Sequence, residues 1–528
     1  MKIITATELK SLITGGQELA ILDVREEGVY SEGHLLYASS LPLSKLEPSI
    51  FQLVPRRSAP IVLCDDGDGL SERAAARLAE FGYLDVAVLE NGMQGWRDAD
   101  HEVFSGVNVP SKAFGEIVEH EQHTPNISAD ELKTKLDAGE DLVVLDSRPY
   151  DEYHRMNIPT GLDVPGAELV HRVHDLAPSP DTLVVVNCAG RTRSIIGAQS
   201  LINAGIPNKV MALKNGTMGW NLAGYDLEHG SDRRVLTSTE AGTAKAMEAA
   251  RRVAEKYGVR TIAMDDLSAW QEETDKRTLY LFDIRNPEEY EAGHLPGSIW
   301  APGGQLVQGT DKYAPVRNAR VVLIDDNGVR ATMTAHWLIQ MGWNDAVVLK
   351  GGLESGELET GKYQPVVAGL DRAKADAISP TDLRALLPDG ATVLDFGRSL
   401  DFKAGHVPGA WFGVRSRLKT ALDNAEIKGE LVTTSDDGTL ARFAAAEASD
   451  ILGQPVRYLD GGTNAWQAAG FDLEDGDGRQ ADEMDDMFLR PYDRASGIEQ
   501  AMNDYLTWEI ELVNQLERDG TTNFNLFN

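Results

Sequence analysis

The chain repeats one order of segments four times, and this repeat constrains the fold more than any other feature of its 528 residues. Each copy opens with an apolar run that ends in Asp and is followed within three residues by Arg. A second apolar run, an Ala-rich segment with helical spacing, and a third apolar run ending at a Gly-containing turn come next. The opening blocks lie at residues 22–25, 145–148, 282–285 and 394–398. One supersecondary unit, copied in tandem, explains such a pattern.

Short, continuous apolar runs that alternate with helical segments predict buried parallel strands joined by helical crossovers. We therefore predict an α/β protein of four tandem units, each a mainly parallel sheet flanked by helices. We call them units one to four, and we expect them at residues 1–105, 126–230, 260–365 and 377–475.

The segments outside the units differ in character. Residues 106–125, which include Pro110, are predicted to form an irregular linker, whereas residues 238–257 start with Ser/Thr caps, stop at Gly258 and predict a helix. Residues 476–528 are predicted to be a C-terminal helical tail. Its apolar residues at helical spacing are Ile498, Met502, Tyr505, Leu506, Ile510, Val513 and Leu516. We favour a helix docked on its own chain; the alternative is a helix that binds a partner or forms a homodimer.

Composition excludes several function classes. The 83 acidic against 50 basic residues give a net charge of −33, which argues against binding of nucleic acid or an anionic membrane surface. No apolar run approaches the roughly 18 residues of a membrane span, and the start lacks a signal-peptide pattern. Two cysteines, Cys64 and Cys188, exclude a disulfide scaffold or a Cys-rich metal cluster. We expect a cytoplasmic protein without a metal or other cofactor.

The loop after the second apolar run is the most informative segment, because chemistry in open α/β sheets sits at the carboxyl ends of strands. Unit two reads Cys188, Ala189, Gly190, Arg191, Thr192, Arg193 and Ser194 there, followed by an apolar helix. In unit one, Cys64 aligns with Asn187, one residue before Cys188. Units one, three and four place Asp65, Asp325 and Asp436 opposite Cys188, each the first of an Asp pair.

Taken together, these motifs resemble the rhodanese family of sulfurtransferases. The resemblance rests on the Asp/Arg block, a Gly-His pair in three units, the Cys-headed loop, and a closing Gly turn that ends in Trp in three units. It covers all four units and implies four rhodanese-like domains. It also implies that unit two is catalytic through Cys188 and that the other three are silent, since a carboxylate forms no persulfide.

The resemblance implies a ping-pong reaction. The Cys188 thiolate takes sulfur from a small-molecule donor such as thiosulfate, and the persulfide passes it to a thiol or cyanide acceptor. Residues 189–194 are the expected substrate-binding loop: its N–H groups, the helix dipole, Arg191 and Arg193 are expected to favour the thiolate.

Unit two departs from the family pattern in two places. Gly190 is third in the loop where many relatives have glycine fourth, and residues 155–157 replace the Gly-His pair.

Two other functions stay open. A Cys-loop phosphatase presents a similar loop that is one residue longer, and a non-catalytic scaffold would use all four units for binding. The Asp pairs could also form a metal site or an acid–base dyad, although we expect each first Asp to cap a helix in a silent unit.

Overall fold

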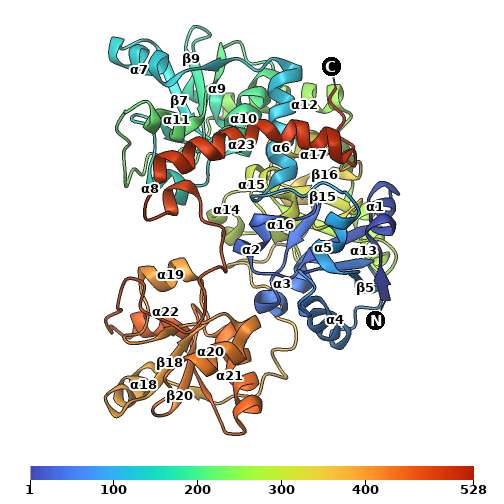
Figure 1. The fold of residues 1–528 in the computed structure, drawn as a ribbon. Helices are drawn as coiled ribbons and strands as arrows, with labels where there is room; N and C mark the ends of the chain where they lie inside the picture. Colours follow the sequence, from blue (N-terminus) through green and yellow to red (C-terminus); the bar gives the residue numbers. More distant parts are fainter. Residues whose placement is uncertain (1, 528) are drawn as a thin grey trace.

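The computed structural model describes residues 2–527 and contains four α/β units in chain order (Figure 1). In each unit five parallel strands follow the spatial order first, fifth, fourth, second, third, and in unit four a sixth strand, β22 (Arg479–Gln480), pairs with the third. The predicted fold class, four parallel-sheet units flanked by helices, is confirmed. The fourth strand is a central strand of each sheet, so the loop that follows it lies at the middle of the sheet's carboxyl edge.

The strands of each unit are short, and the second and fourth strands of each sheet are mostly buried. Unit one contains β1 (Lys2–Ile4), β2 (Leu19–Asp23), β3 (Ala38–Ser40), β4 (Ile61–Cys64) and β5 (Val86–Leu89). Unit two contains β6 (Asn126–Ile127), β7 (Leu142–Asp146), β8 (Leu162–Asp163), β9 (Leu183–Asn187) and β10 (Val210–Leu213). Unit three contains β11 (Arg260–Ile262), β12 (Leu279–Asp283), β13 (Ile299–Trp300), β15 (Arg320–Ile324) and β16 (Ala346–Leu349). Unit four contains β17 (Ala377–Ile378), β18 (Thr392–Asp395), β19 (Trp411–Phe412), β20 (Leu431–Thr434), β21 (Arg457–Leu459) and β22 (Arg479–Gln480).

Helices cover both faces of each sheet. Unit one has α1 (Ala6–Thr14), α2 (Glu27–Glu32), α3 (Leu46–Leu53), α4 (Leu70–Glu80) and α5 (Gly92–Asp98). Unit two has α7 (Ala129–Ala138), α8 (Tyr150–Arg155), α9 (Leu169–Leu176), α10 (Thr192–Asn203) and α11 (Gly216–Leu222). Unit three has α13 (Met264–Glu272), α14 (Pro287–Ala292), α15 (Gly303–Gln308), α16 (Thr310–Tyr313) and α17 (Val329–Gln340). Unit four has α18 (Pro380–Leu386), α19 (Ser399–Ala404), α20 (Leu418–Asn424), α21 (Thr439–Leu452) and α22 (Gly462–Ala468).

Two helices connect the first three units. The predicted linker helix is confirmed as α12 (Glu240–Tyr257), which the Thr239 hydroxyl caps and which ends at Gly258 with a φ of 66°. The prediction of an irregular linker at 106–125 is wrong, because residues 109–122 form helix α6 (Val109–Gln122). No side chain caps α6, but it is buried along most of its length against α10 and the C-terminal helix. Tertiary burial, rather than local capping, stabilises it.

The C-terminal helix α23 (Ile498–Asp519) docks on its own chain, as we favoured. It leaves unit four and crosses the molecule beside α6 and α10 (Figure 1). The buried face of α23 includes its own residues Met502, Leu506, Leu512 and Leu516. Of the predicted apolar set, Ile498 and Ile510 are exposed.

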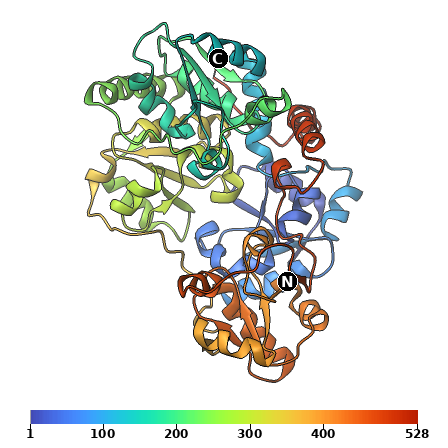
Figure 2. The ribbon, with the colours of Figure 1, turned by 90° about the vertical axis from the view of Figure 1, so that its left-hand side faces the viewer.

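The units also pack directly on one another (Figure 2). A short strand of unit three, β14 (Val316–Arg317), pairs antiparallel with β2 of unit one, so the two units share a sheet edge. Arg415 of unit four is buried and contacts Glu47 of unit one at 2.6 Å. Across residues 2–527, none of the helices has both the length and the apolar character that crossing a bilayer requires.

Candidate active site

Strand register fixes which residues correspond between units. In unit two, Asp146 of β7 pairs with Asn187 of β9, so Cys188 is the first residue of the loop. In unit one, Asp23 pairs with Cys64, which makes Cys64 the counterpart of Asn187 and Asp65 the counterpart of Cys188. The predicted one-residue offset of Cys64 is confirmed, and its side chain is fully buried within the unit-one core.

The same register corrects the alignment of unit four. Asp283 pairs with Ile324 in unit three, so Asp325 corresponds to Cys188, as predicted. In unit four, Asp395 pairs with Thr434, so the counterpart is Ser435 and the assignment of Asp436 is wrong. The error arose because the Asp pair starts one residue later in unit four than in units one and three.

Hydrogen bonds support this correspondence. Asp65 accepts from the N–H of Ser71, six residues later, at 2.9 Å, and Asp325 accepts from the N–H of Ala331 at 3.1 Å. The Ser435 hydroxyl accepts from Ala441 N–H at 3.2 Å, again six residues later. These side chains therefore accept hydrogen bonds from backbone N–H groups at the start of the following helix, as we expected for Asp65 and Asp325.

The Cys188 loop is held in place by the turn that opens α11. The Cys188 carbonyl accepts from the backbone N–H and the hydroxyl of Thr217 at 2.8 and 2.9 Å. Gly216, with a φ of 55°, lies so close that a Cβ would come within 2.4 Å of this carbonyl oxygen. The thiol thus sits at a fixed point at the N-terminal end of α10, 2% exposed.

Burial dominates the electrostatics of the thiol. It raises the pKa of Cys188, while the Arg193 guanidinium and hydrogen bonds from Ser194 lower it and Glu509 raises it further. The net direction is upward, so the prediction that the loop and its arginines hold the thiol pKa low is wrong. The sequence displays the nearby charges but not the extent of desolvation, which opposes them.

The structure separates the two arginines. Arg193 interacts with the thiol and is itself held by Glu152 of α8 at 2.8 Å. Arg191 is engaged elsewhere, because its guanidinium donates to Glu116 at 2.7 Å and also binds Glu119, both on α6. Arg191 therefore anchors α6 to the loop rather than acting as half of a cation pair at the thiol.

A cleft of about 320 Å³ opens beside the loop. Ala189 and Arg193 of the loop line it together with residues from α6, α16, α23 and the segment that precedes α23. A Cβ on Gly190 would lie 3.0 Å from the Glu509 carboxylate and 3.2 Å from the Tyr505 ring, so α23 closes directly over the loop. Thr192 lies in the same contact, with its hydroxyl 3.4 Å from Glu509.

Sequence reasoning missed the contributions of α6 and α23 to this site. The helical spacing at 498–516 indicated a docked helix but not its docking place, and Pro110 was an unused signal for a helix start.

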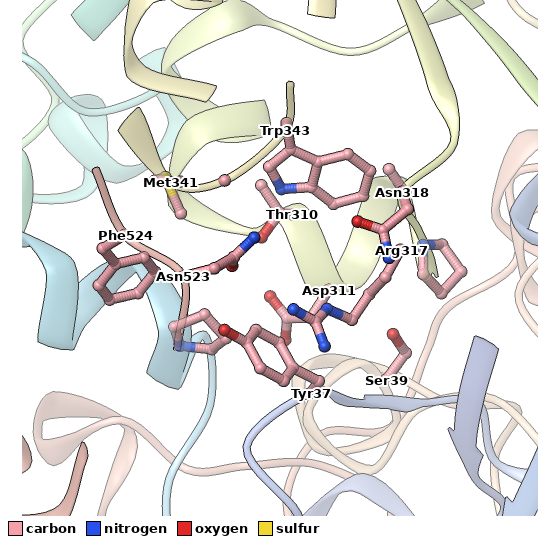
Figure 3. A pocket seen from close by; sticks show the side chains of 14 residues that line it. Tyr37, Ser39, Thr310, Asp311, Arg317, Asn318, Met341, Trp343, Asn523 and Phe524 are labelled. Carbon is pink, nitrogen blue, oxygen red and sulfur yellow. The ribbon is translucent and has the colours of Figure 1, made fainter. Parts of the chain in front are cut away.

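A second cavity lies where unit one, unit three and the C-terminal residues meet (Figure 3). Arg317 stacks on Tyr37 at 3.5 Å in its wall, and Asn523 and Trp343 line the opposite side. Its volume is about 30 Å³, which is the share of one water molecule in the liquid. It is a packing gap and too small for a substrate site.

Known proteins match the chain at the level of each unit. The rhodanese-like domain family matches residues 5–99, 128–223, 263–358 and 379–469. The chain belongs to this family. Each match covers the second to fifth strands of one unit, and the second match contains Cys188.

Two kinds of relative accompany this family match. The crystal structure of a thiosulfate sulfurtransferase from Pseudomonas aeruginosa is similar over 100% of both chains, with 50% identity and a TM-score of 0.96. Shorter relatives match single units. Thiosulfate sulfurtransferase GlpE of Pseudoalteromonas translucida (strain TAC 125) is 25% identical over 16% of this chain and 77% of its own length. The HTH-type transcriptional regulator Rv0324 of Mycobacterium tuberculosis is 30% identical over 20% of this chain, which spans 45% of that relative.

Proposed function

We propose that the protein is a thiosulfate sulfurtransferase that carries sulfur on Cys188. The observation that carries the proposal is the strand register: of the four equivalent loop positions, one holds a thiol, and Ala189 and Arg193 of the same loop line the cleft. The full-length similarity to the Pseudomonas aeruginosa thiosulfate sulfurtransferase supports the activity.

In the first half-reaction, the Cys188 thiolate attacks the sulfane sulfur of thiosulfate. A bond forms between the two sulfurs, the bond to the sulfonate sulfur breaks, and sulfite leaves with its electron pair. Because burial raises the pKa of Cys188, most of the enzyme rests as thiol, and Arg193 and Ser194 stabilise the thiolate that reacts. Backbone N–H groups of residues 189–194 are the expected hydrogen-bond donors to the oxygens of the sulfur donor.

In the second half-reaction, cyanide or a thiol attacks the outer sulfur of the persulfide. The sulfur–sulfur bond breaks and returns Cys188 as thiolate, so the two half-reactions balance without a cofactor. Both cysteines are free thiols, and Cys188 must stay reduced to react. We therefore place the reaction in a reducing compartment, the cytoplasm.

Thiocyanate formation from thiosulfate and cyanide tests the proposal. Cys188→Ser should abolish it, and Cys64→Ser should leave most of it, since Cys64 points into the unit-one core. Equal loss in two folded variants would contradict a single site. Hydrolysis of an aryl phosphate by the wild type, without thiocyanate formation, would favour the phosphatase alternative, and neither activity would favour a scaffold.

A further inference from the structure

Helix α6 places a buried lysine in the wall of the Cys188 cleft. Lys112 is 2% exposed, and its ammonium lies 4.7 Å from the Tyr505 ring and 4.4 Å from the Trp508 ring, both on α23. Among residues 2–527, no side chain or carbonyl lies within hydrogen-bonding or ion-pair distance of this ammonium. The two rings orient the charge through cation–π contacts but do not neutralise it.

The other cations of the cleft each have a carboxylate partner. Arg193 contacts Glu152 at 2.8 Å, Lys312 contacts Glu27 at 3.1 Å, and Arg490 contacts Asp493 at 2.9 Å. Lys112, by contrast, has no carboxylate partner within ion-pair distance among the described residues. A buried charge without a counter-ion is costly, so its position calls for a functional explanation.

The charged groups that face Lys112 come from three elements. The pKa of Lys112 is lowered to about 8, because burial, Lys312 and Arg193 lower it by more than Glu509 and Asp311 raise it. The Glu509 carboxylate lies beyond ion-pair distance of Lys112, and burial and Glu116 raise its pKa by more than Lys112 lowers it. An anion in the cleft would give Lys112 the partner that it lacks.

Lys112 is also close to the loop that carries the nucleophile. Gly115, one helical turn further along α6, packs against Thr192 so tightly that a Cβ there would meet the Thr192 methyl at 2.9 Å. Lys112 therefore lines the same cleft as Ala189 and Arg193, across from the thiol's loop.

We infer that Lys112 binds the oxyanion end of the sulfur donor, so that α6 and α23, which lie outside the catalytic unit, complete the substrate site. The inference rests on the proposed function. With the sulfane sulfur at Cys188, the sulfonate oxygens of thiosulfate extend into the cleft, where the three N–H donors of Lys112 meet them. Tyr505 and Trp508 hold the ammonium in place, which gives the C-terminal tail a role in catalysis.

The test compares an anionic and a neutral reagent at the same sulfur. Iodoacetate and iodoacetamide alkylate Cys188, and peptide mapping separates this product from any at Cys64. The ratio of the two rate constants cancels the thiolate fraction and reports the charge of the cleft. Lys112→Met should lower this ratio about tenfold or more, because the variant removes a positive charge that attracts iodoacetate in a poorly solvated cleft. It should also raise the KM for thiosulfate by a similar factor, with a smaller change in kcat.

Two further variants serve as controls. Lys112→Arg should keep the ratio within about threefold of wild type, because the charge is retained. Lys133→Met removes a surface lysine of unit two that pairs with Asp137, and it should change neither the ratio nor the KM. A Lys112→Met variant that folds and keeps the wild-type ratio would overturn the inference.

The wild-type protein offers a test that needs no variant. Lys112 should lose its charge as the pH rises through about 8, whereas the pKa of Lys312 is raised by Glu27 and Asp311 despite its burial, so Lys312 stays charged. The iodoacetate-to-iodoacetamide ratio should therefore fall between about pH 7 and 9.5. A flat ratio would contradict the role of Lys112. If thiosulfate forms no persulfide, the proposed function fails, and the alkylation ratio still decides whether Lys112 binds anions.

Discussion

Unit four contains a buried carboxylate, Asp395, without the arginine partner that its counterparts have in the other three units. Asp23, Asp146 and Asp283 end the second strands of units one to three, and each pairs with an arginine two residues on at 2.6–2.7 Å. In unit four the counterpart is Asp395, and Gly397 occupies the arginine position. The next residue, Arg398, is exposed and pairs with Asp401 instead. Burial and the neighbouring Asp436 carboxylate raise the pKa of Asp395 to about 7.

The size of the effect follows from this pKa. A rise from 3.8 to about 7 corresponds to a penalty of about 4 kcal/mol for ionising Asp395 in the folded unit. The folded state holds a proton that the unfolded state releases, so unit four loses stability as the pH rises from about 4 to 7. The penalty is complete above about pH 7. Asp395→Asn keeps an acceptor for the Gly397 N–H and cannot ionise.

The variant should therefore be more stable than wild type by a margin that grows about 1.4 kcal/mol per pH unit up to pH 7 and is constant above it. Hydrogen exchange of peptides from β18 and β20, measured in wild type and variant across pH 5–8, isolates unit four from the other units. Asp283→Asn is the matched control: it strands the buried Arg285 and should destabilise unit three by about 3–5 kcal/mol at neutral pH. A margin for Asp395→Asn that does not change with pH would refute the reasoning.

Two further predictions concern the reactive loop and its silent counterpart. Arg193→Gln should raise the pKa of Cys188 further and slow its alkylation at pH 7. Arg191→Gln should mainly loosen α6 and leave the thiol titration nearly unchanged. pH profiles of alkylation measure both effects, and equal shifts would contradict the separation of the two arginines. Ser435→Cys, in a Cys188→Ser background, should form no thiocyanate because Leu440 stands where unit two has Arg193; activity near wild type would show that the thiol alone was missing.

Local sequence signals were enough to predict most of the fold. The apolar run at residues 183–186 predicted a buried strand, and Thr239 with Gly258 correctly bounded α12. Helix α6 was missed because its start at Asn108 has a φ of 56° and no side-chain cap, so burial by distant segments stabilises it. The unit-four misalignment came from matching a residue pair rather than strand register, which the sequence alone does not display.

The candidate site was predictable only where it is contiguous in sequence. Cys188 and Arg193 share one loop, and the structure brings them together. Glu116 reaches Arg191 from 75 residues away, and Glu509 reaches Thr192 from 317 residues away, so no local pattern links them. The predicted direction of the thiol pKa failed for the same reason, since burial under α23 depends on these long-range contacts.

The mass of the protein after treatment with thiosulfate tests the central claim most directly. The wild-type chain, freed of small molecules, should gain the mass of one sulfur atom, and peptide mapping should place it on Cys188. Cyanide should remove that sulfur and restore the original mass. A chain that gains no sulfur, or one that gains it on Cys64, would contradict the assignment of a single persulfide site to unit two.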